Sequence, residues 1–235
     1  MRGQAVGVGA VADWYGRGWR NFREQPGPWI ALILLYVVIG LGANVVPVLG
    51  PLALTLLGPA LGAGLLHAAR EGETGRPVAL ADLFAGLTDR GSRGPLLALG
   101  VGVLVAMFLL VGLYLAAAAA LGMDPRQAGA ARPSPAAAAA GLGLLAAGVA
   151  VSMALFFAVP LVHFARRPAL EALGASLAAC LRNLLPLLAY GLSYAVLAVV
   201  ASIPFGLGML ILGPVGAGAS YACYSDIFPQ GADSP

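Results

Sequence analysis

Two histidines are the side chains of this 235-residue chain best suited to binding haem or a metal ion. His67 and His163 each stand near the end of a long apolar stretch, where they could face each other at one depth. Two imidazoles can ligate iron, but no Cys-x-x-Cys or His-rich segment offers a third ligand. The helix dipole favours the alternative, a hydrogen-bonded histidine at a helix C-terminus. We therefore predict no cofactor and no metal, with His67 and His163 as the only metal candidates.

The motifs of common enzyme classes do not occur in the sequence. It contains no Gly-x-Ser-x-Gly motif, no P-loop and no His-Glu-x-x-His pair. The pattern Gly100-Val101-Gly102 lies inside an apolar stretch, which does not fit a nucleotide-binding loop. Two separate cysteines, Cys180 and Cys223, are interpreted as small apolar residues. We predict no catalytic residue, no enzymatic activity and no nucleic-acid partner.

The composition is that of a protein embedded in lipid. Hydrophobic residues make up 60% of the chain and charged residues 10%, against about 45–50% and about 25% in soluble domains. These values exclude a water-soluble globule, a disordered chain, collagen and a coiled coil. Stretches such as 96–120 are apolar on every face, which favours helices over alternating β-strands. The predicted fold is an all-α, polytopic membrane helix bundle forming a single domain over residues 1–235, with a flexible tail at 229–235.

Six apolar stretches approach or exceed the roughly 20 residues that a membrane-spanning helix needs. They are 29–46, 52–69, 95–122, 136–165, 186–202 and 205–224. Pro160 predicts a kink in the fourth, and the short segments 47–51 and 203–206 predict tight hairpins. Small residues and prolines are predicted to form the hairpins and the close helix contacts. These candidates are Pro47, Gly50, Pro51, Gly58, Pro59, Gly62, Pro204, Gly213 and Pro214.

All 13 basic residues are arginine, and their placement predicts the orientation. Eleven lie before the first, third and fifth stretches, whereas only Arg126 and Arg132 fall on the other side. Because short cytoplasmic segments carry the excess of basic residues, we expect both termini in the cytoplasm. The middle of each span lacks an ionisable residue, which argues against proton or sodium coupling.

A short amphipathic segment precedes each pair of spans, which predicts three interfacial helices. Their apolar stripes begin at Val11, Leu80 and Leu170, and the alternative is that each helix packs on the ends of the spans. Two span ends also share a pattern: 67–70 reads His-Ala-Ala-Arg and 163–166 reads His-Phe-Ala-Arg. We interpret these features as a threefold repeat of surface helix, span and span. Its units are 8–70, 78–166 and 168–228.

Aromatic and charged residues at the Arg-rich ends of the spans are predicted to contact lipid headgroups or a membrane partner. The alternative is that the arginines only set the orientation. The interface candidates are Trp14, Arg17, Trp19, Arg20, Arg23, Trp29, Arg182, Asn183, Tyr224 and Asp226.

Five short patterns together resemble an uncharacterised family of bacterial inner-membrane proteins with six helices. They are Gly18-Trp19…Phe22, Pro28-Trp29, Pro-x-x-Gly-Pro at 47–51, Leu-Arg-Asn-x-x-Pro at 181–186 and Tyr-x-Asp-Ile-Phe at 224–228. That family is distantly similar to the membrane domain attached to some glycerophosphodiester phosphodiesterases. This chain lacks the phosphodiesterase part, so the resemblance implies no such activity. It implies a multi-pass protein of the bacterial inner membrane.

The expected function is that of a non-enzymatic membrane organiser or accessory subunit. Its partners would be the phospholipid membrane, and a membrane protein or a second copy of the chain. The alternative is a small uncoupled transporter or channel for an apolar or amphipathic solute. That alternative predicts a cavity lined by Ser152, Ser193, Tyr190 or Tyr194.

Overall fold

The computed structural model describes residues 3–122 and 134–229, and within these ranges it contains helices and no strand. Arg126, Arg132 and positions 230–235 of the predicted tail lie outside the described residues. The all-helical prediction is confirmed for the described part of the chain. The helices are α1 Ala10–Glu24, α2 Pro26–Asn44, α3 Leu49–Glu73, the 3-10 helix η1 Leu80–Phe84, α4 Ala85–Thr88, α5 Arg90–Ala120, α6 Pro135–Phe156, α7 Ala158–His163, α8 Ala169–Arg182, α9 Leu184–Ser202 and α10 Met209–Ile227.

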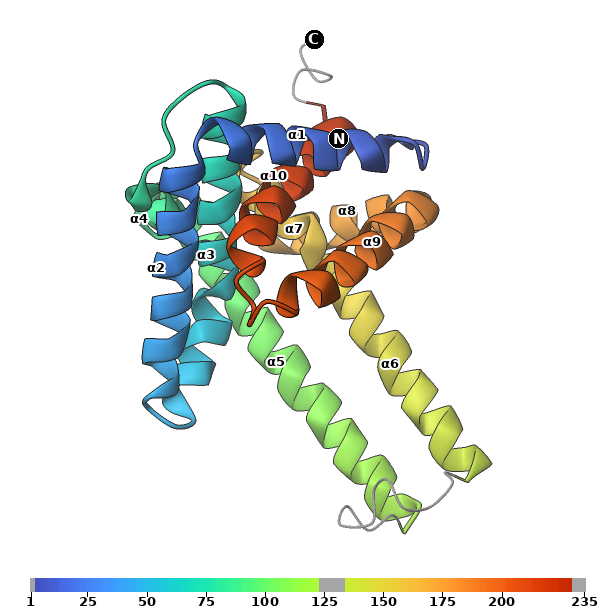
Figure 1. Cartoon of the computed structure of the whole chain (residues 1–235). Coiled ribbons are helices and arrows are strands. Elements are labelled where there is room, and N and C mark those ends of the chain that lie inside the picture. The colour runs from blue at the N-terminus through green and yellow to red at the C-terminus, as the bar shows by residue number, and fades with distance from the viewer. Residues whose placement is uncertain (1–2, 123–133, 230–235) are drawn as a thin grey trace.

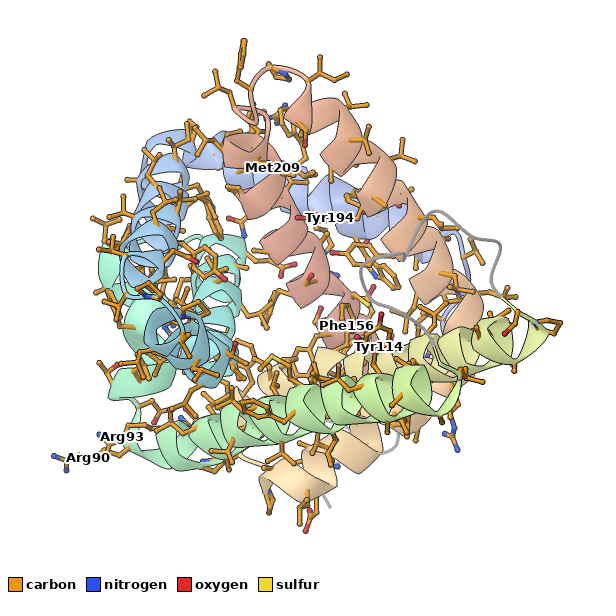
Figure 2. All side chains as sticks on the ribbon, turned by 90° about the horizontal axis from the view of Figure 1, so that it is seen from below. Arg90, Arg93, Tyr114, Phe156, Tyr194 and Met209 are labelled. Atoms are coloured by element: carbon orange, nitrogen blue, oxygen red, sulfur yellow. The ribbon has the colours of Figure 1, made fainter. Side chains whose placement is uncertain are left out.

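Five helices of the described chain are long and apolar enough to cross a membrane: α2, α3, α5, α9, and α6 continued by α7. The sixth predicted span corresponds to α10, which is rich in glycine, tyrosine and serine and does not reach the same hydropathy. Its composition follows from its place, because α10 lies between α2–α3 and α9 when the molecule is seen from below (Figure 2). A helix enclosed by protein needs no apolar side chains for lipid on its outer face.

The first helix lies across the ends of the others, and Figure 1 shows it beside the C-terminal end of α10. Gly18 allows this contact, since a Cβ there would lie 2.3 Å from the backbone oxygen of Val215. Trp14 and Phe22 are buried on the same face. The inner face of α1 therefore packs on the ends of the spans, as the alternative to an interfacial helix predicted.

The other two amphipathic segments also pack on protein through one face. Residues 80–88 form η1 and α4 rather than one regular helix, and Leu83 is buried against α3. Helix α8 buries small residues such as Ser176, and its leucine stripe is half-buried at Leu173 but 84% exposed at Leu170. A short helix thus precedes each pair of longer helices in chain order, while the internal repeat itself stays a prediction.

A side chain from α8 breaks the fourth predicted span between α6 and α7. The hydroxyl of Ser176 accepts from the backbone N–H of Phe157 at 2.9 Å and donates to the carbonyl of Met153 at 2.7 Å. These are the two groups that would otherwise bond to each other in a continuous helix. Pro160, where the kink was predicted, lies three residues further on, and α7 resumes at Ala158. The break turns the end of α7 toward α3 and α5.

The glycines at which helix backbones come into close contact differ from several of those that we predicted from sequence spacing. A Cβ on Gly64, Gly86 or Gly100 would lie within 2.5 Å of a backbone oxygen on a neighbouring element. Gly58 and Gly62, which we predicted as packing residues, have no such atom within 4 Å. The prediction of close packing at these two positions is therefore wrong, because they face away from the neighbouring helices.

The two hairpins are tight turns that need a close backbone approach and unusual backbone angles. A Cβ on Gly50 would lie 1.6 Å from the carbonyl oxygen of Ala43, so only glycine lets α3 start this close to α2. Val48 and Phe205 have positive φ angles in the two turns. The remaining candidates divide by exposure: Pro59 and Pro214 are buried inside helices, Gly213 lies against Ile33, and Pro47, Pro51 and Pro204 are exposed.

The outward faces of the long helices are apolar. Figure 1 shows α5 and α6 extending beyond the other helices, and side chains such as Phe108, Leu109 and Leu142 are exposed along them. In the view from below, Arg90 and Arg93 project away from the body at the start of α5 (Figure 2). Apolar side chains around the helices with charges near their ends are the pattern expected for helices in a bilayer.

Candidate functional site: a histidine pair beside a basic pocket

The structure brings the two histidines together where the C-terminal ends of α3 and α7 meet the start of α5. The Nδ1 atom of His67, on α3, lies 3.4 Å from Nε2 of His163, on α7, and their ring centroids are 5.5 Å apart. A pocket of about 360 Å³ opens beside them at the start of α5. Its lining residues are His67, Arg70, Ala85, Thr88, Asp89, His163, Phe164 and Arg166. The pocket contains both copies of the His-x-x-Arg pattern.

A chain of hydrogen bonds fixes the tautomers of the two rings. Ser92 donates its only hydroxyl hydrogen to Asp89 Oδ2 at 2.8 Å, because an ionised carboxylate cannot donate. The 3.1 Å contact between Ser92 Oγ and His163 Nδ1 then requires hydrogen on Nδ1. Nε2 of a neutral His163 ring is left as an acceptor for Nδ1–H of His67. The remaining nitrogen of His67, Nε2, makes no hydrogen bond within the described residues.

This order of hydrogen bonds does not make a nucleophilic serine. Ser92 is fully buried, and its hydrogen points to Asp89 instead of to a histidine base. The histidine contact also leaves no space for a porphyrin between the two rings. Among residues 3–122 and 134–229, no group of three His, Cys, Asp or Glu side chains could hold a metal ion.

Asp89 connects the network to the opposite wall of the pocket. It caps α5 by accepting from the backbone N–H of Gly91 at 3.0 Å and pairs with Arg166. Arg166 has a φ of 56°, the left-handed conformation that a non-glycine residue rarely adopts, as the chain turns after α7. Burial acts to raise the pKa of the Asp89 carboxyl. Hydrogen bonds from Arg166, Ser92 and Gly91 outweigh it, so the pKa lies below its ordinary value of 3.8.

The variant Asp89→Asn tests this capping role. A carboxyl with a lowered pKa stabilises the folded state above its ordinary pKa and loses that contribution as the pH falls through its folded-state value. We expect Asp89→Asn to lose about 1–2 kcal/mol at neutral pH, since hydrogen bonds to a charged group are removed. The difference from the unchanged protein should shrink below about pH 4. Thermal unfolding in detergent over a pH series measures it, and a pH-independent difference would contradict the role.

Arg70 supplies a second guanidinium at the pocket. It belongs to the last turn of α3, is exposed, and its Cζ lies 5.4 Å from the centre of the Phe164 ring. No carboxylate among the described residues forms an ion pair with it. The pocket therefore combines one unpaired cation, one cation shared with Asp89 and one open imidazole nitrogen.

Several predicted interface residues lie inside the protein instead of at its surface. Trp14 donates to Asp226 at 2.8 Å, and Arg17 bonds both Asp226 at 2.8 Å and Glu73 at 2.7 Å. Burial acts to lower the pKa of Arg17, but these two carboxylates outweigh it and raise the pKa above its ordinary value. The cluster ties α1 to the ends of α3 and α10. Its members hold the helices together, and the side chains of Glu73 and Asp226 stay about one-third exposed, at 30% and 31%.

Three further interface candidates are buried. Trp29 donates to Asn21 at 3.0 Å, and Tyr224 stacks on the ring of Phe164. Asn183 accepts from the backbone N–H of Val6 at 2.8 Å, which fixes the segment before α1. The prediction of these three side chains as surface contacts was wrong, because each hydrogen-bonds or stacks with a neighbour inside the bundle.

The remaining interface candidates are exposed. Trp19 is 48% exposed on the outer face of α1, and Arg20 and Arg23 are exposed beside it. Arg182 is exposed at the end of α8, where it lines a second pocket of about 420 Å³ with apolar neighbours that include Leu185.

The residues proposed to line a transport cavity do not gather around either pocket. Ser152 bonds its own helix at the carbonyl of Gly148. Tyr190 is buried and lies 2.9 Å from the hydroxyl of Ser220, while Ser193 bonds the carbonyl of Ala189. Figure 2 shows Tyr194 beside α10. A Cβ on Gly216 of α10 would lie 2.7 Å from the ring of Tyr194. The contacts of Tyr190 and Tyr194 hold α9 against α10, and the transport alternative stays a prediction.

Comparison of the chain with protein-family models, with curated proteins and with solved structures gives no match. The function is therefore inferred from the residues and their geometry.

The sequence indicated part of this site and missed the rest. The repeated His-x-x-Arg pattern was the signal for His67, Arg70, His163 and Arg166. Nothing in the sequence singled out Ser92, whose role depends on the start of α5 meeting the end of α7.

Proposed function

We propose that this protein is a non-enzymatic membrane organiser or accessory subunit that engages anionic phospholipid headgroups on its Arg-rich side. In this proposal α10 is a sixth crossing, and both chain ends face the cytoplasm of a bacterial cell. The protein would then belong with the inner-membrane family that its motifs resemble.

The outer face of α1 is the observation that carries the proposal. The helix is held flat across the bundle by the buried Trp14 and the ion pairs of Arg17. This leaves Trp19, Arg20 and Arg23 directed outward together. Tryptophan is enriched at the membrane–water interface, and each arginine near an anionic leaflet contributes about 1 kcal/mol. The tertiary structure leaves this side of the amphipathic helix exposed, which supports the proposal that it contacts lipid.

Tryptophan quenching by brominated lipids tests the proposal. Trp14 and Trp29 are fully buried, so lipid quenching reports mainly on Trp19. In nanodiscs we expect stronger quenching by brominated phosphatidylglycerol than by brominated phosphatidylcholine. The double variant Arg20→Gln/Arg23→Gln should reduce this preference roughly thirtyfold, given about 1 kcal/mol for each of the two arginines.

The matched control is Arg90→Gln/Arg93→Gln, which removes the same charge from the start of α5, and it should keep the preference. Trp19→Phe should remove most of the quenching. Equal quenching by the two lipids, or equal effects of the two double variants, would overturn the proposal.

A further inference from the structure

We propose that the pocket beside the histidine pair binds a phosphate group, and that His67 takes up a proton when the phosphate binds. The inference deepens the proposed function and rests on it only for the source of the phosphate, which would be an anionic lipid headgroup. The same chemistry could be supplied by free phosphate, and the experiment distinguishes the two.

The charges around the pocket point to an anion. The guanidinium of Arg70 has no carboxylate partner among the described residues, and that of Arg166 is only half-buried beside Asp89. Guanidinium groups on two walls of one pocket match the oxygens of a phosphate, which they bind by charge-assisted hydrogen bonds.

The position of the pocket favours a headgroup. Arg70 lies in the last turn of α3, Asp89 caps the start of α5, and His163 ends α7. These are ends of helices long and apolar enough to cross a membrane, so in the proposed orientation the pocket would lie at headgroup depth. Basic pockets between membrane helices are a common way to hold anionic lipid headgroups.

The hydrogen-bond chain explains why binding should be linked to a proton. Nδ1–H of His67 is committed to His163, so the Nε2 atom of a neutral His67 ring is an acceptor that would repel phosphate oxygens. A protonated His67 donates from both nitrogens, one to His163 and one to the ligand. Asp89, through Ser92, holds His163 in the tautomer that accepts this hydrogen bond.

The charges around His67 link the binding of the anion to the binding of the proton. His163, Asp89, Arg70 and Arg166 are the titratable and charged groups that face His67. The lining of the empty pocket includes two guanidinium groups, of Arg70 and Arg166, and one carboxylate, of Asp89. A bound phosphate reverses this balance, so the anion and the proton should bind together.

Titration calorimetry with dioctanoyl phosphatidylglycerol in detergent micelles tests both parts. This phosphodiester keeps one negative charge through the range in which histidine titrates, so any proton uptake belongs to the protein. At about pH 7, in two buffers of different ionisation enthalpy, we expect uptake of a fraction of one proton per lipid. Arg70→Gln should weaken binding about tenfold or more, and Arg70→Lys should recover part of it.

His67→Gln separates the two claims. It should abolish the proton uptake while keeping measurable lipid binding through the arginines. Arg93→Gln is the matched control, because it removes an exposed arginine that projects away from the body in Figure 2. Dioctanoyl phosphatidylcholine, whose charge is neutralised, should bind more weakly in every variant. Size-exclusion chromatography and thermal unfolding verify that each variant is folded.

Each outcome decides the question. Binding of inorganic phosphate that equals that of the lipid would support the site and assign it to free phosphate, whereas lipid binding alone would assign it to headgroups. If neither probe binds, if Arg70→Gln and Arg93→Gln behave alike, or if His67→Gln leaves the proton uptake unchanged, the inference is overturned. A failure of Trp19 quenching with intact binding here would reject the role of α1 and leave the pocket.

Discussion

Gly100→Ala is expected to destabilise the protein by about 3 kcal/mol, one of the two largest effects that we predict for a single substitution. A Cβ on Gly100, in α5, would lie 1.9 Å from the carbonyl oxygen of Leu56 in α3. Backbone atoms cannot move aside as a side chain can, so the two helices must separate along their contact. Overpacking of this kind costs about 1–3 kcal/mol, and more when backbone must shift. In lipid, close packing is also the main attraction between helices.

Gly102→Ala is the matched control for this prediction. Gly102 lies in the same helix and the same kind of sequence, but it has no neighbouring atom within 4 Å of the added Cβ. Because alanine is the better helix former by about 1 kcal/mol, this variant should be neutral or slightly stabilised. Thermal or SDS-induced unfolding in detergent measures both. Similar unfolding of the two variants would show that α3 and α5 do not approach as closely as described.

Arg17→Met is expected to cost about 2–3 kcal/mol and to loosen α1 from the bundle. The side chain of Arg17 is only 18% exposed and joins Glu73 of α3 to Asp226 of α10. Its removal leaves two carboxylates facing each other without a cation. Breaking a buried pair costs about 3–5 kcal/mol, and the partial exposure of the carboxylates reduces that value.

A double-mutant cycle isolates the interaction. Asp226→Asn added to Arg17→Met should cost less than the sum of the two single changes, by about 1 kcal/mol or more. Arg20→Met, on the exposed face of the same helix, is the control and should stay within about 0.5 kcal/mol of the unchanged protein. Unfolding in detergent gives the free energies, and additive effects would remove Arg17 from the list of contacts that hold α1.

These ion pairs connect stability with the proposed function. They fix the rotation of α1, and that rotation decides that Trp19 faces outward while Trp14 faces α10. We therefore expect Arg17→Met to weaken the lipid preference of Trp19, even though Arg17 itself is bound to Glu73 and Asp226. The same reasoning applies to the pocket, where Asp89 acts by holding His163 and Arg166 in place.

The local sequence pattern was sufficient to predict most of the helices and the hairpin turns. Long apolar runs predicted the helices α2, α3, α5, α6 and α9, because a chain in lipid must satisfy its backbone groups within each helix. The hairpin at 47–51 followed from the chemistry of proline and glycine, and Gly50 fulfils it through its contact with Ala43. The break in the fourth span was predicted from Pro160, but Ser176 on another helix places it at Phe157.

The sequence by itself determined that this is an all-helical protein with apolar helices, tight hairpins and arginines near the helix ends. Only the tertiary structure decided which tryptophan is buried, which glycines touch a neighbour, and that Ser92 joins Asp89 to His163. The physical reason is that helix formation and burial in lipid depend on residues close in the chain. The rotation of each helix and the meeting of helix ends depend on contacts between residues far apart in it.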